Sequence, residues 1–558
     1  MPEPVPTQVS RSDRAEHMFP ALSAAQMARV AQHGRARAVA PDDVLFDVGQ
    51  TVVPFFVVTR GQVEIVRPSA TAPTVITVHG VGEFTGEVNM LSGRRTLVRA
   101  RALADTAVIE LSHDGLLTLV QTDAELSEII MRAFILRRVE LIAHGLGDVV
   151  LVGSSHCAGT LRVREFLSRN GHPYSSVDLD RDESIQALLD RFNVQPADVP
   201  VLICRGDTVL RNPTNRQIAD CLGFNEAVDA TKVRDVVIVG AGPSGLAAAV
   251  YAASEGLDTL VVETNAPGGQ AGASSKIENY LGFPTGISGQ ELAGRAFTQA
   301  QKFGAQIVIA KGARELTCAR RPYAVAIDDD VTVPARTVII ATGAAYRRLE
   351  LGNLAQFEGA GIYFGATAIE AQLCRDSEVV VVGGGNSAGQ AAVFLAQTAR
   401  RVYMLVRATG LAATMSRYLI RRIEDNPAIT LLTETEIVGL EGDTALERVR
   451  WRHAPTDRVE TRELRHVFVM TGALPTTAWL QGCLALDARG FIKTGPDLTP
   501  EDLHTAGWPL GRAPHLLETS LPGVFAVGDV RGGNIKRVAS AVGEGAIAVA
   551  FVHRVLAE

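Results

Sequence analysis

The chain has 558 residues, 47% of them hydrophobic and 21% charged, and its formal net charge is -7 at pH 7. This length predicts three or four globular domains, and the apolar fraction is sufficient for several hydrophobic cores. The acidic balance, without a long basic run, argues against binding of nucleic acid through its phosphate backbone.

The six cysteines are scattered along the chain, and none belongs to a CxxC motif. This spacing predicts neither a disulfide framework nor a zinc site, and we expect no metal and a reducing cytoplasm. The cysteines are Cys157, Cys204, Cys221, Cys318, Cys374 and Cys483.

Three segments bear on whether the chain enters a membrane. Residues 1–19 lack the apolar core of a signal peptide. The uncharged stretches 236–254 and 379–399 each change from a Val-rich run through glycines to an Ala-rich run. This punctuation is typical of a strand, a turn and a helix, so we expect buried nucleotide-binding units and no membrane partner.

Residues 15–145 begin with a short helical pattern and continue with short strands. The segment 44–66 alternates apolar and polar residues, with breaks at Gly49 and Gly61. From 112 to 143 the period becomes helical. These patterns predict a β-barrel followed by long helices. The expected apolar helix face consists of Leu116, Leu119, Val120, Leu126, Ile129, Ile130, Ala133 and Phe134.

Residues 148–225 have the pattern of a compact α/β unit, in which Gly171 is a suitable C-cap for the first helix. The expected elements are a strand (148–153), a helix (160–171), a strand (174–180), a helix (184–192), a hairpin (200–212) and a helix (215–224).

Residues 231–558 repeat a strand–glycine loop–helix pattern, which predicts parallel, doubly wound sheets. The first glycine loop is GAGPSG at 240–245. Gly240 permits the tight turn, Gly242 allows a pyrophosphate to approach the backbone at the helix N-terminus, and Gly245 permits close packing of helix on strand. Glu263 ends the next strand, at about the spacing expected of a ribose-binding acid.

The second glycine loop places Gly383, Gly385 and Ala388 in the same three roles. Its second strand ends at Arg407, which favours the 2′-phosphate of NADPH over NADH. The alternative is that Arg407 is a solvated charge at a strand end. Two such units in one chain suggest FAD with NADPH, because a flavin accepts the hydride that a nicotinamide donates.

Further motifs resemble the low-molecular-weight thioredoxin reductases over residues 231–558. They are GGQ (268–270), IENYLGFP (277–284), ATG (341–343), TGALPTT (471–477) and the segment 522–546. The resemblance implies a homodimer and an FAD domain split into residues 231–351 and 478–558. The NADPH domain, residues 352–477, is inserted between the two parts.

The resemblance also implies two sets of cofactor-binding residues. Those expected to bind FAD are Gly240, Gly242, Gly245, Glu263, Gly269, Gln270, Asn279, Thr342, Gly343, Gly528, Asp529, Arg537, Val538 and Ala539. Those expected to bind NADPH are Gly383, Gly385, Asn386, Ser387 and Arg407.

The chain departs from this family at the redox-active dithiol. Where the family has a CxxC, this chain has Gly365, Ala366, Thr367 and Ala368. Cys374 stands alone a few residues later. A dithiol relay needs one thiolate to attack and another to resolve, so we expect weak thioredoxin reductase activity. The family's paired arginines are also reduced to Arg407 followed by Ala408.

The segment 154–174 resembles the start of a glutaredoxin, and we interpret residues 148–230 as a thioredoxin-like domain. Cys157 then stands at the nucleophile position and Thr160 at the resolving position. Val199-Pro200 falls where such folds keep a cis-proline. A thiol at a helix N-terminus favours the thiolate. A lone thiol has no resolving partner, however, so we favour a degenerate adaptor over a redox role for Cys157.

Residues 1–147 resemble a cyclic nucleotide-binding domain, and 82–111 resembles its phosphate-binding cassette. The resemblance implies that Glu87 takes the ribose hydroxyl, that Arg94 pairs with the cyclic phosphate and that Gly86 leaves room for the ligand. Arg95 then stands where the family has a small residue. The alternative is a docking or dimerisation module without ligand.

These observations predict a multidomain chain: a jelly-roll β-barrel with helices, a thioredoxin-like α/β domain and two Rossmann-like three-layer α/β domains. The predicted activity is hydride transfer from NADPH to FAD and then to an acceptor. A quinone or dye-like molecule, oxygen, a disulfide at the flavin and Cys157 remain candidate acceptors. Cyclic AMP or cyclic GMP is the candidate regulator. A redox sensor with little turnover is the alternative function.

Overall fold

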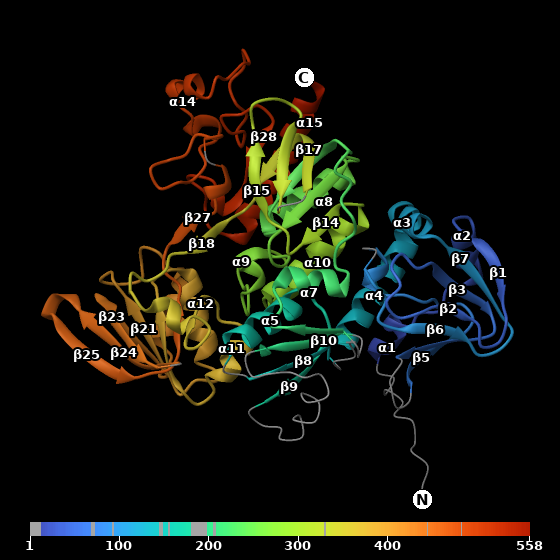
Figure 1. Cartoon of the computed structure of the whole chain (residues 1–558), viewed down its shortest axis with the longest axis horizontal. Helices are drawn as coiled ribbons and strands as arrows, with labels where there is room; N and C mark the ends of the chain where they lie inside the picture. The colour runs from blue at the N-terminus through green and yellow to red at the C-terminus, as the bar shows by residue number, and fades with distance from the viewer. Residues whose placement is uncertain are drawn as a thin grey trace, which may run out of the picture.

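The computed structural model describes most of the chain and arranges it in several lobes (Figure 1). The helix predicted at 184–192 lies outside the described residues. The structure describes residues 13–67, 73–91, 94–143, 149–154, 157–179, 198–204, 208–328, 331–443, 445–480 and 482–558.

The N-terminal lobe consists of two antiparallel sheets around one core, as the alternating strands predict. One sheet has the strand order β1-β7-β3 and the other the order β2-β6-β4-β5. Phe55, Phe56, Phe84 and Phe134 are fully buried in this core. The strands are β1 (Arg35–Val39), β2 (Val44–Phe46), β3 (Phe55–Arg60), β4 (Val63–Arg67), β5 (Thr74–His79), β6 (Arg99–Ala102) and β7 (Thr106–Leu111).

Helices close this lobe, and the helical run expected over 112–143 divides into two. Ser112 caps α3 (His113–Thr122), and the Asp123 carboxylate accepts from the Leu126 amide at the start of α4 (Ala124–Ala143). The predicted apolar face is buried in the core, with Ile129 partly buried. The other helices here are α1 (Asp13–Met18), α2 (Ala24–Ala31) and the 3-10 turn η1 (Val88–Leu91).

A four-stranded sheet with the order β11-β10-β8-β9 follows. β8 and β9 are parallel, whereas β10 is antiparallel to both β8 and β11. The first helix ends as predicted, with Gly171 in the left-handed region at φ 61°. The elements are β8 (Val149–Gly153), α5 (Ala158–Arg169), β9 (Ser175–Asp178), β10 (Val201–Cys204), β11 (Thr208–Arg211) and α7 (Asn215–Leu222).

The largest sheet is built from two parts of the chain. Strands β14-β13-β12-β17 continue into the antiparallel β16-β15, and β28, from near the C-terminus, pairs in parallel with β17. The strands are β12 (Arg234–Val239), β13 (Thr259–Glu263), β14 (Gln306–Ile309), β15 (Ala313–Thr317), β16 (Tyr323–Ile327), β17 (Val331–Ile340) and β28 (Val524–Ala526). The helices are α8 (Pro243–Ser254), α9 (Gly269–Gly272), α10 (Gly289–Lys302), α14 (Pro500–Thr505) and α15 (Val538–Ala557).

A parallel sheet with the order β19-β26-β20-β21-β22 is inserted between these two parts. The antiparallel pair β18 (Ala344–Tyr346) and β27 (Ala473–Pro475) joins it to the larger sheet. Its strands are β19 (Ile362–Tyr363), β20 (Glu378–Val382), β21 (Arg401–Val406), β22 (Ile429–Thr433) and β26 (Val467–Val469). It also contains α11 (Ala368–Leu373), α12 (Asn386–Leu395), α13 (Arg417–Glu424) and the meander β23 (Thr435–Gly442), β24 (Leu446–His453) and β25 (Arg458–Glu463).

The two uncharged stretches noted in the sequence are strand–turn–helix units, as predicted: β12 with α8, and β20 with α12. One other helix, α15, is long and apolar enough to cross a membrane by those two measures alone. α15 packs along α8, with Gly545 so close to the Ser244 carbonyl that a side chain there would clash. The apolar face of α15 is thus used in the core of the larger sheet's domain.

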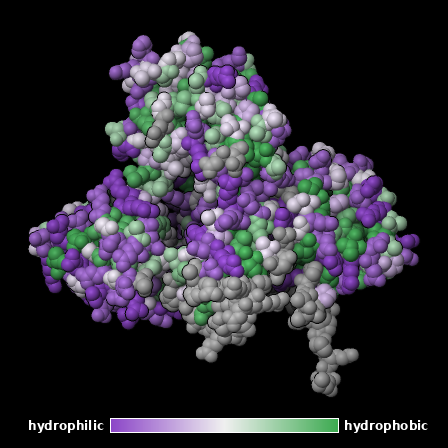
Figure 2. Space-filling model, viewed as in Figure 1, coloured by the Kyte–Doolittle hydropathy of each residue, from purple (hydrophilic) through white to green (hydrophobic). Residues whose placement is uncertain are grey.

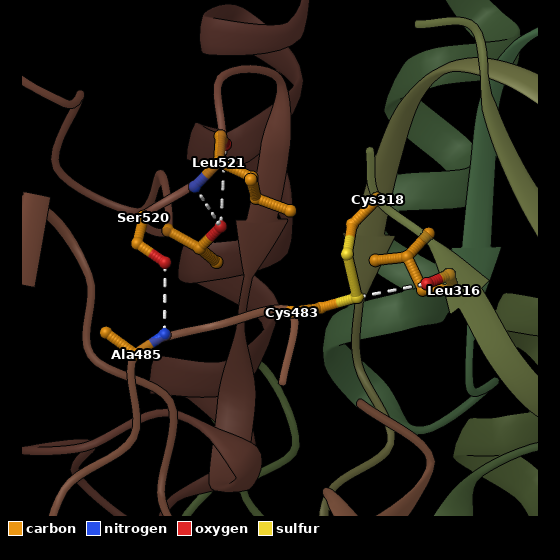
Figure 3. Close-up of a disulfide and its surroundings, with 7 residues drawn as sticks. Leu316, Cys318, Cys483, Ala485, Ser520 and Leu521 are labelled. Atoms are coloured by element: carbon orange, nitrogen blue, oxygen red, sulfur yellow. Dashed lines mark hydrogen bonds between the residues drawn. A yellow bond between two sulfur atoms is a disulfide. The ribbon is translucent and has the colours of Figure 1, made fainter. Parts of the chain in front are cut away.

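The structure corrects the prediction that the cysteines form no disulfide. Cys318, after β15, is bonded to Cys483, which follows the 3-10 turn η6 (Ala478–Leu480). Figure 3 shows the bond joining the two parts of the split domain. The partners are 165 residues apart, and they meet only because the C-terminal part returns to the edge of the larger sheet. Sequence spacing therefore held no sign of the pair.

Candidate functional site

A cavity of about 1500 Å³ lies between the larger sheet and the inserted sheet. Both glycine turns line it, together with the connecting pair β18 and β27. Figure 2 shows a hollow between these two lobes, on a face where hydrophilic and hydrophobic residues are interspersed. The C-terminal ends of β12 and β20 point to this cavity, as expected of a ligand site in doubly wound sheets.

The first glycine turn has the backbone geometry predicted for pyrophosphate binding. Gly240 has φ 104°, and a side chain there would clash with the Ala341 carbonyl. A side chain at Gly245 would clash with the Gly240 carbonyl. Gly242 caps α8, and the nearest atom to where its Cβ would lie is the Cα of Gly269, at 4.0 Å. The turn thus leaves a cradle at a helix N-terminus that fits a phosphate group.

Glu263 ends β13 at the wall of the cavity, with 7% of its surface exposed. Its carboxylate accepts from the Ala241 amide at 2.7 Å and from the Asn265 amide at 2.9 Å. Burial raises the pKa of Glu263 above its usual value, although these two hydrogen bonds act to lower it. The carboxylate therefore fixes the glycine turn while one edge stays available to the cavity.

Most of the other residues predicted to bind FAD also line the cavity. Gln270 donates to the Ala344 carbonyl, and Thr342 donates to the Thr476 carbonyl at 2.9 Å. Gly528, whose amide donates to Glu544, and Ala539 stand outside the lining. Those that line it are Gly269, Gln270, Asn279, Thr342, Gly343, Asp529, Arg537 and Val538.

The second glycine turn opens on the same cavity. Gly383, Gly385, Asn386 and Ser387 line it, and the Asn386 side chain accepts from the Ser416 amide at 2.7 Å. Arg407 lies exposed at the rim, at the end of β21. It makes no hydrogen bond or ion pair with any described residue, so its guanidinium is free for an anionic ligand.

The segment in place of the expected dithiol also faces the cavity. Gly365, Ala366 and Thr367 line it. Thr367 caps α11 by accepting from the Ile369 amide, and its hydroxyl donates to the Glu370 carboxylate. Burial raises the pKa of Glu370. Cys374 is fully buried, and burial raises the pKa of its thiol to about 12, aided by Glu370. Cys374 therefore cannot supply a thiolate at neutral pH.

One wall of the cavity was not anticipated from the sequence. Helix α5 presents one face to the cavity, because positions three or four residues apart lie on the same side of a helix. The residues on this face are Ala158, Leu161, Arg162, Glu165 and Arg169. Because this face mixes apolar and charged residues, it has the composition of a solvent-exposed helix face. The sequence period alone therefore does not identify it as the wall of a cavity.

Helix α5 is held in this position at both ends. Leu161 packs in one cluster with Tyr363 and Ala366. Ala366 belongs to the segment that stands where the dithiol was expected. At the other end Arg169 donates to the Gly269 carbonyl at 2.7 Å. The helix therefore packs against the segment at Ala366 and reaches the loop at Gly269.

The predicted nucleophile lies at the start of this helix. Cys157 is half-buried, occupies the N-cap position of α5 and is not among the residues that line the cavity. Val199-Pro200 has the expected cis peptide bond, and Pro200 lies against Gly159. The structure therefore brings Cys157 near the cavity wall without placing it on that wall.

The N-terminal site differs from its prediction. Gly86 and Glu87 line a cavity of about 90 Å³. Arg94 does not line this cavity. Its guanidinium lies 4.8 Å from the Phe224 ring centre and 5.0 Å from that of Phe297. Burial lowers the pKa of Arg94 to about 9, helped by nearby Arg138.

Comparison with known proteins supports the division of the chain. A model described as pyridine nucleotide-disulphide oxidoreductase matches residues 234–545, and one described as cyclic nucleotide-binding domain matches residues 36–123. The thioredoxin reductase of Mycolicibacterium smegmatis is 35% identical over 326 residues, which are 58% of this chain and 97% of that protein.

Solved structures agree. Thioredoxin reductase from Lactococcus lactis matches with TM-score 0.52 and 26% identity, covering 58% of this chain and 99% of its own. That of T. acidophilum matches with TM-score 0.52 and 28% identity, with shares of 58% and 99%. The predicted resemblances of the reductase-like part and of the first domain are confirmed. Thioredoxin reductases use FAD and NADPH, so the predicted cofactors are confirmed at the level of the family.

Proposed function

Because the chain belongs to the pyridine nucleotide-disulphide oxidoreductase family, we propose that it oxidises NADPH and reduces an acceptor. The chain would do so without a redox-active dithiol, because its residues 365–368 contain no cysteine. When bound, FAD would supply a flavin that can take a hydride from NADPH and give electrons to the acceptor. The observation that carries this proposal is the single cavity on which both glycine turns open. We assign FAD to residues 231–351 and 478–558, and NADPH to 352–477.

The residues at the first turn would hold the FAD diphosphate. Backbone amides at the N-terminus of α8 point toward the open space at Gly242 and favour negative charge there. Asp529 and Gln270 also line the cavity and would position the rest of the cofactor. At the second turn the free Arg407 would pair with the 2′-phosphate of NADPH.

The acceptor is a small molecule in this proposal. Gly365, Ala366 and Thr367 carry no thiol, and Cys374 is buried. α5 packs over this segment through Leu161, which hinders the approach of a protein disulfide from solvent. A quinone or dye-like acceptor within the cavity needs neither thiol nor protein docking.

We assign residues 148–230 to a thioredoxin-like adaptor domain. The strand order β11-β10-β8-β9, the cis peptide at Pro200 and the helix after Cys157 support this assignment. Cys157 lies off the cavity wall, which favours the adaptor over a redox role. The N-terminal domain, residues 1–147, would bind cyclic AMP or cyclic GMP, and we propose a cytoplasmic homodimer.

Anaerobic titration of purified protein with NADPH tests the proposal. We expect a yellow protein whose flavin absorbance bleaches, followed by rapid reoxidation with a quinone and slow reoxidation with thioredoxin. A colourless protein that takes up no added FAD would contradict it. Bleaching without turnover on any acceptor would favour the sensor instead. Thioredoxin reduction as fast as reduction of a quinone would refute the small-molecule acceptor, and Cys157→Ser would then show whether that thiol carries the electrons.

A further inference from the structure

Arg94 lies at a junction of three domains. It follows η1 in the N-terminal domain, and only 7% of its surface is exposed. Phe224, after α7, and Phe297, on α10, each hold a ring against its guanidinium. A guanidinium on an aromatic face is an attractive contact that strengthens when water is excluded. The residue expected to bind a cyclic phosphate therefore holds two other domains instead.

Neighbouring contacts make this a docking surface rather than a single contact. Arg95 donates to the Cys221 carbonyl at 3.0 Å, and Gln121 donates to the Lys302 carbonyl at 2.9 Å. Arg95 also packs on Gly223. The N-terminal domain thus contacts both α7 and α10, with Arg94 near the centre of the contact.

The charges around Arg94 are not balanced. Arg94 and Arg138 interact with a single carboxylate, Glu87, which lies 3.6 Å from Arg138. Arg94 Nε, Arg138 Nη1 and Glu87 Oε2 are buried without a hydrogen-bond partner. Buried guanidinium nitrogens that lack a hydrogen-bond acceptor are costly. A phosphate between the two arginines would supply acceptors to both, and a ribose hydroxyl could donate to Glu87.

We propose that the phosphate of a cyclic nucleotide and the rings of Phe224 and Phe297 compete for Arg94, with Arg138 as a second phosphate ligand. Nucleotide binding then weakens the docking of the N-terminal domain on α7 and α10. Arg94 is not part of the cavity that Glu87 lines, so this structure represents the docked state. By linkage, docking and nucleotide binding weaken each other by the same factor, so a variant with weaker docking should bind the nucleotide more tightly.

Helix α10 can carry this change to the loop at residues 268–271, which contains two residues that we expect to bind FAD, Gly269 and Gln270. Nearer its N-terminus, in line with Phe297, Ala293 packs against Gly268, and Gly289 lies so close to the Ala271 carbonyl that a side chain would clash. Ala271 belongs to α9, next to Gln270 at the cavity. A shift of α10 would therefore move the loop that lines the cavity. This last step rests on the proposed function, whereas the competition for Arg94 does not.

Calorimetry on the full-length protein tests the competition directly. Cyclic AMP, cyclic GMP and inorganic phosphate would each be titrated into the wild type, Phe297→Leu, Phe224→Leu, Arg94→Ala and Arg138→Ala. Loss of one ring contact is expected to tighten cyclic nucleotide binding about three- to thirtyfold. The arginine variants should lose binding. Phe303→Leu is the matched control, because it removes a nearby ring, just after α10, that is paired with Lys302 instead.

Hydrogen exchange provides a second measurement that needs neither NADPH nor turnover. Bound nucleotide should increase exchange of the α10 amides in the wild type, and Phe297→Leu should do so without nucleotide. Tighter nucleotide binding in both ring variants supports the proposal, even if the wild type binds too weakly to measure. Unchanged affinity in both ring variants, no binding by any variant, or phosphate binding as tight as nucleotide binding would overturn it. Failure of NADPH to bleach the flavin would instead refute the proposed function.

Discussion

The dinucleotide cavity and the N-terminal site differ in what gives them their shape. Backbone turns at Gly240 and Gly383 form the cavity, and Arg407 at its rim has no partner among the described residues. In the N-terminal domain the corresponding cation, Arg94, contacts rings from two other domains. A site made by backbone geometry is ready for its ligand, whereas a site made by long side chains can be diverted by a neighbouring domain.

The largest expected effect comes from breaking the backbone turn. Gly245→Val places a side chain against the Gly240 carbonyl, so helix α8 must move away from the turn. We expect the purified variant to lose bound FAD, measured as flavin absorbance per protein. Gly543→Ala is the control, because a side chain there, on α15, meets no atom within 4 Å. A variant of Gly245 that keeps its full complement of FAD would show that the close approach is not needed.

Opening the disulfide should have the next largest effect, because the bond joins the two parts of the chain that form the cavity. Loss of the Cys318–Cys483 link, with its sequence separation of 165 residues, should cost about 2–4 kcal/mol. We expect Cys318→Ser to lower the temperature at which FAD is released. Dithiothreitol should lower it in the wild type but not in Cys318→Ser. Cys221→Ser, outside the disulfide, should respond to dithiothreitol as the wild type does.

A smaller effect is expected from acid in the N-terminal domain, because a buried histidine in its cavity resists protonation. His79 lines that cavity, and burial lowers its pKa from 6.5 to about 4, while Glu83 opposes the shift. Above pH 6.5 the imidazole is neutral in both states. As the pH falls toward 4, only the unfolded chain binds the proton, so stability is lost.

Between pH 7 and pH 5 this loss should be about 2 kcal/mol. Thermal unfolding of the wild type and His79→Gln at both pH values measures it. The variant should lose less stability on acidification, and His17→Gln, at an exposed position, should behave as the wild type does. An equal pH dependence in His79→Gln would mean that His79 is protonated in the folded domain.

These contrasts also separate what the sequence could predict from what it could not. Gly240 and Gly383 were assigned to tight turns and have positive φ, and Gly245 was assigned to close packing and has no room for a side chain. Such turns could be predicted because they are a local property of the backbone. The rings that hold Arg94 and the helix face of α5 depend on how domains pack. The local sequence period does not predict which domains pack against each other. The Cys318–Cys483 pair was missed for the same reason, since its partners meet only in the assembled sheet.

The smallest effect tests whether Arg407 is as free as its surroundings indicate. It is exposed at the cavity rim without a partner among the described residues, so its charge should act on a bound ligand rather than on the fold. Arg407→Ala should raise the KM for NADPH about tenfold, the loss of one charge-assisted hydrogen bond, and leave thermal stability unchanged. The KM for NADH should hardly change, because NADH has no 2′-phosphate. Arg401→Ala, exposed at the other end of β21, is the matched control and should affect neither KM. Equal increases for NADPH and NADH would place Arg407 away from the 2′-phosphate, and the preference for NADPH would then need another cation.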